Sequence, residues 1–396
     1  MQKGGFAAGG VMRSDPRQAK NMHVLLVDLG NELRGGQIQV FYLARALMRR
    51  DDIAPVVACP RGSALALLLE REGIPLLPLP GRAPFNPLVL FTVERALRRH
   101  AFRIIHTHDA NAASLGWIFK TLHGDSLRLI HSRRVSYPLH NGMRLKKYLL
   151  ADAVVGVSAE ISAVVEQAGV PADRISTIHS GIDPSRYRPK AARNDGRVVF
   201  LSIGALTPQK GYSVLLQAMS VLKEMEDLPP WEVRIVGQGP LFNDILDEAV
   251  QLGVESRLAL LGRQDGRKIL PDCDVLVVPS VDGEGSSAAI KEGWVTGLPV
   301  ICSSLPSNTE LVRDKIDGLV APTGNPLALA AAMARCMMED PLRARLSARG
   351  RARVWQFTDR AMALAYAALY RRLEGQPEDE EATPQPDENA EPDQPA

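Results

Sequence analysis

The sequence predicts an α/β fold with two Rossmann-like domains that face each other across a central cleft. Short, almost wholly apolar runs of strand length recur along the chain, and the stretches between them are long enough for helices. Such alternation predicts parallel strands joined by crossover helices on both faces of a sheet. The chain has 396 residues, which exceeds the roughly 250–300 residues at which a single core stops growing. Two domains are therefore expected.

The strand pattern occurs twice. The first half begins with the apolar run Met22–Leu29, which is followed by glycines at Gly35 and Gly36 and then by a helical pattern. Its further strands are expected at Ala54–Cys59, Arg103–Thr107, Arg128–Ser132 and Ala153–Ser158. The second half repeats the pattern, with strands expected at Arg197–Ile203, Glu232–Val236, Arg257–Leu261, Asp274–Pro279 and Pro299–Ser303. Ligands bind outside the carboxyl ends of such strands, so the cleft between the two halves is the expected site.

Composition sets the expected boundaries. The join should lie near Tyr187–Arg197, where a proline, several charges and a glycine interrupt the apolar pattern. The tail is rich in proline and acid and cannot bury enough apolar surface to order itself. We expect a disordered N-terminus at 1–20, a first domain at 21–190 that a C-terminal helix at 357–374 packs against, a second domain at 191–356, and a disordered acidic tail at 375–396.

Charge favours an anionic partner. The formal net charge is +2, but the tail from Gln376 carries eight acidic residues and no lysine or arginine, so the rest of the chain carries +10. A basic body suits nucleotide diphosphates or phospholipid headgroups. Nucleic acid would satisfy the same charge, and the charge alone does not decide between them.

Cysteine spacing and hydropathy argue against a zinc site, a disulfide framework and a membrane-spanning helix. The four cysteines lie far apart without a Cys-x-x-Cys pair, which supports neither a zinc site nor a disulfide framework. No run approaches the roughly 18 apolar residues of a spanning helix. Residues 1–20 also lack the apolar stretch of a signal peptide. A cytoplasmic protein with reduced, mostly buried thiols is expected.

The stretch Val277–Pro299 is the most informative part of the chain. A buried strand ends near Pro279, and a helix is expected to start near Ser286, with Glu284 just before it and Glu292 two turns from Glu284. Backbone N–H groups of the first helical turn have no partner within the helix and, with the helix dipole, form an anion site that suits a diphosphate. The alternative interpretation is that Glu284 is a solvated loop acid and Glu292 an exposed helical residue.

Lys210 lies in a second strand-to-helix turn, Ile203–Tyr212. A lysine there can neutralise phosphate charge without requiring a specific geometry, although a solvated surface lysine is the favoured interpretation of Lys210 taken on its own. The turn Gly237–Pro240 is incomplete as a dinucleotide fingerprint. No full Gly-x-Gly-x-x-Gly follows the first strand of either half, so a dehydrogenase is not favoured.

Together these motifs resemble the retaining glycosyltransferases of family 4. The resemblance spans Met22 to Leu373, and its most specific part is Glu284–Val300, with supporting matches at Gly35-Gly36, His106–His108, Gly181-Ile182-Asp183 and Lys210-Gly211. It implies the GT-B fold, in which two Rossmann-like domains face a catalytic cleft. It also implies transfer of a sugar from a nucleotide-diphosphate sugar to a glycan or lipid-linked acceptor, with the anomeric configuration retained and without a metal or another cofactor. Nucleic acid is not expected as a partner.

The resemblance also implies roles for individual residues. Lys210 matches the lysine that pairs with the donor diphosphate, Glu284 the acid near the transferred sugar, and His108 a histidine of the first domain that reaches that sugar. Glu292 matches the acid that holds the donor ribose. The implied catalytic residues are His108, Lys210 and Glu284, and the implied donor-binding residues are Gly35, Gly36, Lys210, Glu284, Gly285, Ser286, Ser287 and Glu292. Without the family, a histidine satisfied at a strand end is the favoured interpretation of His108.

Three positions depart from the family pattern. Ala205 stands where an arginine commonly helps the lysine, Ser286 where an aromatic residue is common, and Ser180 where an asparagine often precedes Gly-Ile-Asp. A different grip on the donor is expected.

Segment 131–150 places five cations among apolar residues, the cations being Arg133, Arg134, Arg144, Lys146 and Lys147. It could rest on an anionic membrane and receive a lipid-linked acceptor, or it could be a solvated basic face. With the family resemblance it suggests the synthesis of lipopolysaccharide or another envelope glycan. The competing functions are a nucleotide-sugar epimerase with the same two-domain architecture and a non-catalytic nucleotide-sugar-binding protein.

Overall fold

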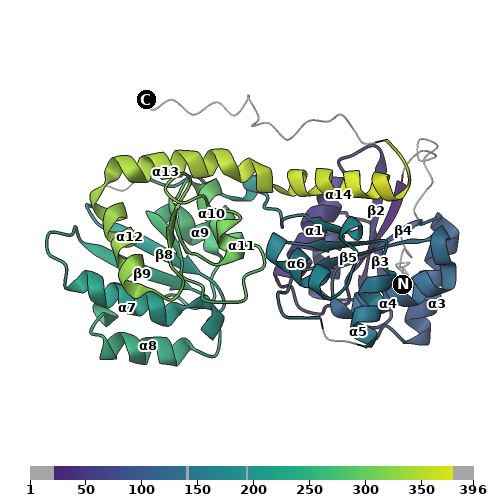
Figure 1. The fold of residues 1–396 in the computed structure, drawn as a ribbon, viewed down its shortest axis with the longest axis horizontal. Coiled ribbons are helices and arrows are strands. Elements are labelled where there is room, and N and C mark those ends of the chain that lie inside the picture. The colour runs from purple at the N-terminus through teal and green to yellow at the C-terminus, as the bar shows by residue number, and fades with distance from the viewer. Residues whose placement is uncertain (1–21, 140–141, 193–194, 378–396) are drawn as a thin grey trace, which may run out of the picture.

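A computed structural model describes residues 22–139, 142–192 and 195–377. It has two α/β domains, each built on one parallel sheet with helices packed on both faces (Figure 1). The predicted fold class is therefore confirmed. The segment 1–20 and residues 378–396 of the acidic tail, which we expected to be disordered, lie outside the described residues.

The first sheet has seven strands in the order β3-β2-β1-β4-β5-β6-β7. Their bounds are β1 Met22–Val27, β2 Ile53–Pro60, β3 Leu76–Leu79, β4 Ile104–Thr107, β5 Arg128–Arg133, β6 Ala153–Gly156 and β7 Ile175–Thr177. The helices between them are α1 Gly35–Leu47, α2 Ala64–Arg71, α3 Pro87–His100, α4 Ala110–His123, α5 Met143–Leu150 and α6 Ala159–Gln167. The strands are mostly apolar because both faces of a parallel sheet are covered.

The second sheet has six strands in the order β10-β9-β8-β11-β12-β13. Their bounds are β8 Val198–Ile203, β9 Trp231–Val236, β10 Leu258–Leu260, β11 Val275–Val278, β12 Val300–Ser303 and β13 Leu319–Ala321. The helices that follow β8 along the chain are α7 Tyr212–Lys223, α8 Phe242–Gln251, α9 Gly266–Ile269, α10 Ala288–Thr296, α11 Pro306–Thr309, α12 Pro326–Met338, α13 Asp340–Arg353 and α14 Asp359–Leu373, and all but α14 belong to the second domain.

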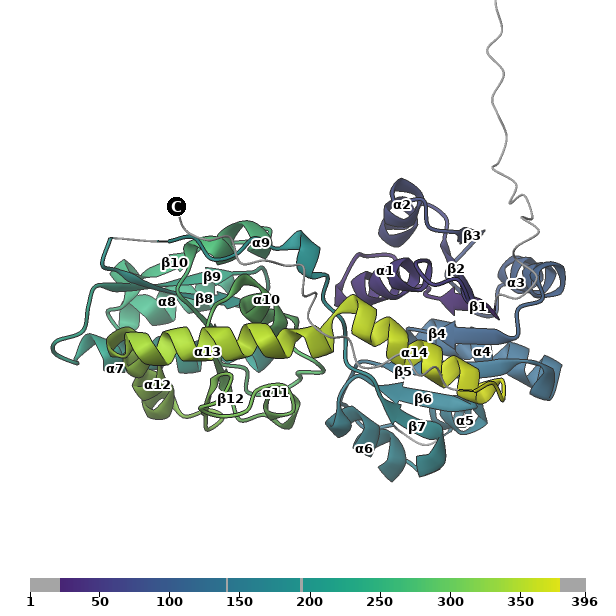
Figure 2. The same cartoon turned by 90° about the horizontal axis from the view of Figure 1, so that it is seen from above.

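The last two helices run one after the other across both domains (Figure 2). Helix α14 packs on the first domain, where Tyr366 and Tyr370 join the core formed by α1 and the sheet. The connection is polar as well as apolar, because Arg45 of α1 forms ion pairs of 2.7 Å with both Asp183 and Asp359. These contacts fix the segment between the sheets and the start of α14 against the same helix of the first domain.

Gly181 lies where the chain crosses between the two sheets. Its backbone N–H and C=O are both bonded to the Gln39 side chain, at 2.7 and 2.9 Å. A Cβ at this position would lie 2.8 Å from Cα of Asp359. The Gly181-Ile182-Asp183 motif therefore has a packing role that needs the absence of a side chain at its first position.

We expect Gly181→Ala to lower the free energy of unfolding by about 1–3 kcal/mol, because the new methyl group meets backbone that cannot move aside. Urea unfolding followed by circular dichroism measures this loss. Gly35→Ala is the matched control for stability, since a Cβ there has no neighbour within 4 Å. Equal stability of the two variants would contradict this account of the crossing.

Candidate active site

The site of the first domain lies where its strand order reverses. Strand β1 lies between β2 and β4, so the connections leaving β1 and β4 diverge to opposite sides at this point, where open α/β sheets bind ligands. The segment after β1 leads to Gly35 and Gly36 at the start of α1, and His108 directly follows β4. The sheet thus brings the predicted glycines and His108 to one edge.

The second domain has an equivalent point between β8 and β11. Lys210 ends the short helical turn Pro208–Lys210 after β8, and Glu284 lies in the loop after β11. Residues that are 74 positions apart in the sequence therefore meet: Lys210 Nζ lies 2.6 Å from Glu284 Oε1. The turn is tight, because Gly211 has φ of +66° and packs against the carbonyl of Pro279.

Ser280 positions the carboxylate of the Lys210–Glu284 pair. The Ser280 hydroxyl donates a 2.6 Å hydrogen bond to the same Oε1 atom of Glu284. The Glu284 side chain is 7% exposed and that of Lys210 is 28% exposed, so the lysine is the more accessible partner. An ammonium group has three N–H donors, and the bond to Glu284 uses one of them. The pair therefore presents a fixed cation, with N–H donors that have no further partner among the described residues, at the carboxyl ends of the strands.

Glu292 belongs to a different group of side chains. Its Oε1 accepts a 3.0 Å hydrogen bond from the hydroxyl of Tyr187, a residue of the segment between the domains. Burial raises the pKa of Glu292, and the Tyr187 hydrogen bond and Arg267 oppose that shift. Sequence reasoning missed Tyr187, which was seen only as part of the expected join.

The helix after Glu284 starts later than expected. Helix α10 begins at Ala288, and Ser287 is its N-cap residue, so Ser286 is not helical. The start expected near Ser286 therefore lies two residues early. The Ser287 side chain makes no capping hydrogen bond, and the Ser286 hydroxyl accepts a 2.6 Å hydrogen bond from Lys291 Nζ within the preceding loop. The N–H groups of the first turn belong to Ala288, Ala289 and Ile290.

His108 lies in a buried polar cluster. Its ring is tilted by 41° to that of His106, with centroids 4.0 Å apart, and its Nδ1 lies 3.4 Å from both Nη atoms of Arg134. Burial holds the pKa of His108 well below its usual value, so the ring is neutral. Because a guanidinium only donates, Nδ1 accepts and Nε2 carries the proton. That N–H is buried and has no partner among the described residues.

Comparison with known proteins identifies the family. Residues 183–353 match glycosyl transferases group 1, and residues 33–186 match glycosyltransferase family 4. The chain belongs to glycosyltransferase family 4. The resemblance predicted from the sequence is confirmed, and the two matches together reach across both domains.

Two curated relatives and one solved structure illustrate the likeness. The UDP-Gal:alpha-D-GlcNAc-diphosphoundecaprenol alpha-1,3-galactosyltransferase of Escherichia coli is 27% identical over 254 residues, which are 58% of this chain and 65% of that protein. This chain therefore spans less than two thirds of that relative. The lipopolysaccharide core biosynthesis glycosyltransferase LpsD of Rhizobium meliloti is 27% identical over 292 residues, 72% of this chain and 80% of LpsD. Anabaena HepE in complex with UDP has a TM-score of 0.75 at 19% identity, covering 89% of this chain and all of HepE, and so shares the fold.

This family 4 glycosyltransferase has a buried lysine that sequence reasoning missed. Lys291 is 1% exposed, and its Nζ donates 2.6 Å hydrogen bonds to the Ser180 carbonyl and to the Ser286 hydroxyl. It thereby links the loop after Glu284 to the segment that crosses between the domains. Burial lowers the pKa of Lys291 to about 7, and the nearby Glu310 opposes that shift. Lys291 was missed because it precedes Glu292 in a helical pattern, where a lysine is usually exposed to solvent.

The lowered pKa of Lys291 predicts a pH-dependent stability. Between pH 7 and about 10.5 the unfolded chain keeps this proton and the folded protein does not, so stability rises with pH in this window. In Lys291→Met that rise is absent. From pH 6 to pH 9 we expect wild type to gain at least about 1.4 kcal/mol relative to the variant, the value of one pKa unit. Urea unfolding at both pH values measures it, with the exposed Lys223→Met as control. A pH-independent difference would refute the assignment.

The basic segment 131–150 is only partly exposed. Arg133 stacks on Tyr137 and Tyr148, and Lys147 donates to the Ala110 carbonyl and the Ser114 hydroxyl; Arg133 and Lys147 are both buried. Arg134 is half-buried beside His108, so the exposed cations are Arg144 and Lys146. Residues 140–141 lie outside the described residues. Among the described helices, none has both the length and the apolar character required to span a bilayer.

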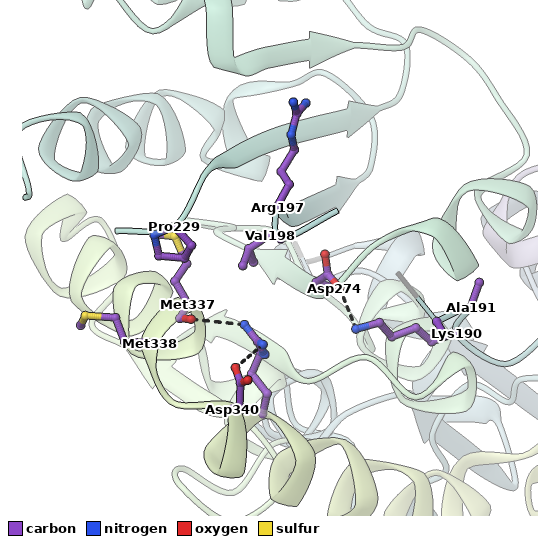
Figure 3. Close-up of a pocket in the computed structure, with 12 residues that line it drawn as sticks. Lys190, Ala191, Arg197, Val198, Pro229, Asp274, Met337, Met338 and Asp340 are labelled. Atoms are coloured by element: carbon purple, nitrogen blue, oxygen red, sulfur yellow. Dashed lines mark hydrogen bonds and ion pairs between the residues drawn. The ribbon is translucent and has the colours of Figure 1, made fainter. Parts of the chain in front are cut away.

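A pocket of the second domain lies at the other edge of its sheet (Figure 3). It is lined by Val198, the first residue of β8, and by Asp274, which precedes β11. Lys190 Nζ pairs with Asp274 Oδ1 at 2.7 Å, and Asp274 Oδ2 accepts from the backbone N–H of Val199. Asp274 therefore fixes the strand ends and the segment between the domains. Since Lys210 and Glu284 follow the opposite ends of these strands, this pocket is separate from the candidate active site.

Proposed function

We propose that this glycosyltransferase moves a sugar from a nucleotide-diphosphate sugar to a glycan or lipid-linked acceptor, with retention of the anomeric configuration. The observation that carries the proposal is the Lys210–Glu284 pair at the point of strand reversal in the second domain. The loop that holds Glu284 also reaches the first domain, because a Cβ on Gly285 would lie 2.9 Å from the backbone oxygen of Arg134. The two strand-reversal points therefore serve one site.

In the proposed reaction, Lys210 and the first turn of α10 stabilise the departing diphosphate. Cleavage of the bond between the anomeric carbon and the phosphate oxygen builds negative charge on the leaving group, while the sugar becomes oxocarbenium-like. An ammonium fixed by Glu284 and backbone N–H groups fixed by a helix offer this charge donors that need no reorganisation. The acceptor hydroxyl attacks the face that the diphosphate leaves, and the diphosphate takes its proton. Glu292 holds the ribose and His108 Nε2 donates to the sugar.

UDP-sugars are the donors that the relatives favour. HepE was solved with UDP and also with UDP-glucose, and the name of the Escherichia coli relative specifies a UDP-linked donor and a lipid-diphosphate acceptor. LpsD is named for lipopolysaccharide core synthesis. On this basis we place the activity in the synthesis of lipopolysaccharide or another envelope glycan.

A thermal-shift screen of nucleoside diphosphates and their sugars tests the donor. A bound donor raises the melting temperature in proportion to the logarithm of its concentration over its Kd. We expect UDP to stabilise the protein and UMP to do so less. Product analysis with the UDP-sugar that binds then separates the alternatives: an epimerase converts the donor sugar without an acceptor, and a binding protein leaves it unchanged. Either result would overturn the proposal.

We also propose that the first domain docks on an anionic membrane near Arg144 and Lys146. Exposed Val135, Tyr137 and Leu149 lie in the same segment and supply the apolar component. Flotation with vesicles that contain anionic lipid at low salt should carry the protein upward. The docking would be contradicted if the protein stayed at the bottom of the gradient while the vesicles floated. It would also be contradicted if the double variant Arg144→Glu/Lys146→Glu floated as well as wild type.

A further inference from the structure

A set of groups in the first domain, here called the Arg134 corner, consists of Gly35 and Gly36 at the start of α1, His108 and Arg134. Strands β1, β4 and β5 are neighbours in the sheet, and the three parts of the corner follow their carboxyl ends. The Arg134 side chain passes over the start of α1, since a Cβ on Gly36 would lie 3.9 Å from its Cδ. The corner is thus one compact group at the point of strand reversal.

The Arg134 guanidinium has a neutral neighbour where a carboxylate is usual. Its Nη atoms lie 3.4 Å from His108 Nδ1 and from the His108 carbonyl oxygen, and its buried Nε has no partner among the described residues. Asp28 and Asp109 are the acidic residues that interact electrostatically with the Arg134 guanidinium. Asp28 accepts from Gln37 and the Gly30 N–H, and Asp109 caps α4 through Asn111 and Ala112. Neither acid is hydrogen-bonded to Arg134 within the described part of the chain.

The remaining groups of the corner are donors as well. The first-turn N–H groups of the 13-residue helix α1 have no intrahelical acceptors, and its dipole places positive charge at Gly35 and Gly36. The space beside Gly35 is open, because a Cβ there would have no neighbour within 4 Å. The His108 Nε2–H points away from Arg134, because Nδ1 of the same ring faces the guanidinium, and it is the donor that we assign to the sugar. A cation and a helix start at one point of the sheet together lack one component, an anion.

We propose that the Arg134 corner binds a phosphoryl oxygen of a substrate, with Arg134 as its charged donor. A guanidinium offers paired N–H groups that match phosphate oxygens. The backbone of Arg134 touches the loop that carries Glu284, so the anion would lie between the two domains, beside the reacting groups. This inference rests on the proposed function. The phosphoryl group belongs either to the donor diphosphate or to a phosphate of the acceptor.

Isothermal titration calorimetry of Arg134→Met, Arg134→Lys and wild type distinguishes the two sources. In the first arm UDP is titrated, and in the second arm inorganic phosphate is titrated into protein saturated with UDP, which occupies the Lys210 side. We expect Arg134→Met to weaken one of the two by at least about 10-fold, the cost of one charge-assisted hydrogen bond, and Arg134→Lys to recover part of it. Arg95→Met, which removes an exposed arginine from helix α3 of the same domain, is the control.

Each outcome has a defined meaning. A loss in the UDP arm assigns the corner to the donor diphosphate, and a loss in the phosphate arm alone assigns it to an acceptor phosphate. If Arg134→Met melts like wild type and binds both probes with wild-type affinity, the inference is wrong. If Arg134→Met has a lower melting temperature than wild type, Arg134→Lys is the deciding variant. The inference then requires Arg134→Lys to bind UDP or phosphate more weakly than wild type, and wild-type affinity of Arg134→Lys for both probes would refute it. A wild-type protein that binds neither UDP nor another nucleoside diphosphate would refute the proposed function instead.

Discussion

Lys210→Met is expected to lower kcat/KM for sugar transfer by about 10²- to 10³-fold, the loss seen when one preorganised donor is removed from a developing anion. The reason is the position of the ammonium. Lys210 is fixed by Glu284 at 2.6 Å and keeps further N–H groups for the diphosphate. The methionine keeps most of the length of the side chain and removes the ammonium group, with its charge and its N–H donors. Initial rates with a saturating acceptor and varied donor measure the effect.

Two comparisons separate this effect from unfolding. In Lys210→Met the shielded Glu284 carboxylate loses its cation and keeps the hydrogen bond from Ser280, which can lower the stability of the fold. The melting temperature of Lys210→Met must therefore be recorded alongside the rates. Lys223→Met removes an exposed lysine from the helix that follows Lys210, and we expect it to retain wild-type rates. Activity within a factor of a few of wild type in a folded Lys210→Met protein would exclude Lys210 from catalysis.

Glu292→Gln is expected to weaken UDP binding by about 10- to 100-fold. A hydrogen bond to a charged group contributes about 1.5–3 kcal/mol, and every 1.4 kcal/mol corresponds to about tenfold in affinity. Glutamine keeps the shape of the side chain and its bond to Tyr187. It replaces the carboxylate, whose second oxygen is the acceptor we assign to a ribose hydroxyl. Calorimetry with UDP measures the change.

Tyr187→Phe is the matched partner of this variant. It removes the hydroxyl that positions Glu292 and leaves the carboxylate in place, so a smaller loss of UDP affinity is expected. Both variants should bind inorganic pyrophosphate as wild type does, because neither residue is assigned to the phosphates. A larger loss in Tyr187→Phe than in Glu292→Gln would show that the carboxylate does not hold the nucleotide.

The sequence predicted the central strands and the edge strand β10, and it missed the other edge strands. Each expected strand appears within a few residues, because a strand covered on both faces leaves a continuous apolar run. The missed strands are β3, β7 and β13, and all three lie at the edges of their sheets. They are three or four residues long, and β3 contains Pro78, which an edge position tolerates. These three strands carry too little apolar pattern to be recognised, whereas β10 was predicted because its apolar run continues from Leu258 to Leu261.

The candidate site was predictable to the extent that its residues follow central strands. Lys210 and Glu284 each end a strand-to-helix turn, so their meeting follows from the order of the sheet. Tyr187, Lys291 and Arg134 could not be found in this way. Tyr187 lies in an irregular segment, and Lys291 has a polar partner far away in sequence at Ser180. Arg134 lies next to the buried Arg133 in a run of cations that predicted a basic surface, and only the packing shows which cation faces the site.

A crystal structure of the protein with UDP is the most direct test of the account. It should show Lys210 Nζ within hydrogen-bond distance of a diphosphate oxygen, the first turn of α10 directed at the same group, and Glu292 bonded to a ribose hydroxyl. UDP bound at the opposite edge of the second sheet, or with its diphosphate out of reach of Lys210 and α10, would contradict it.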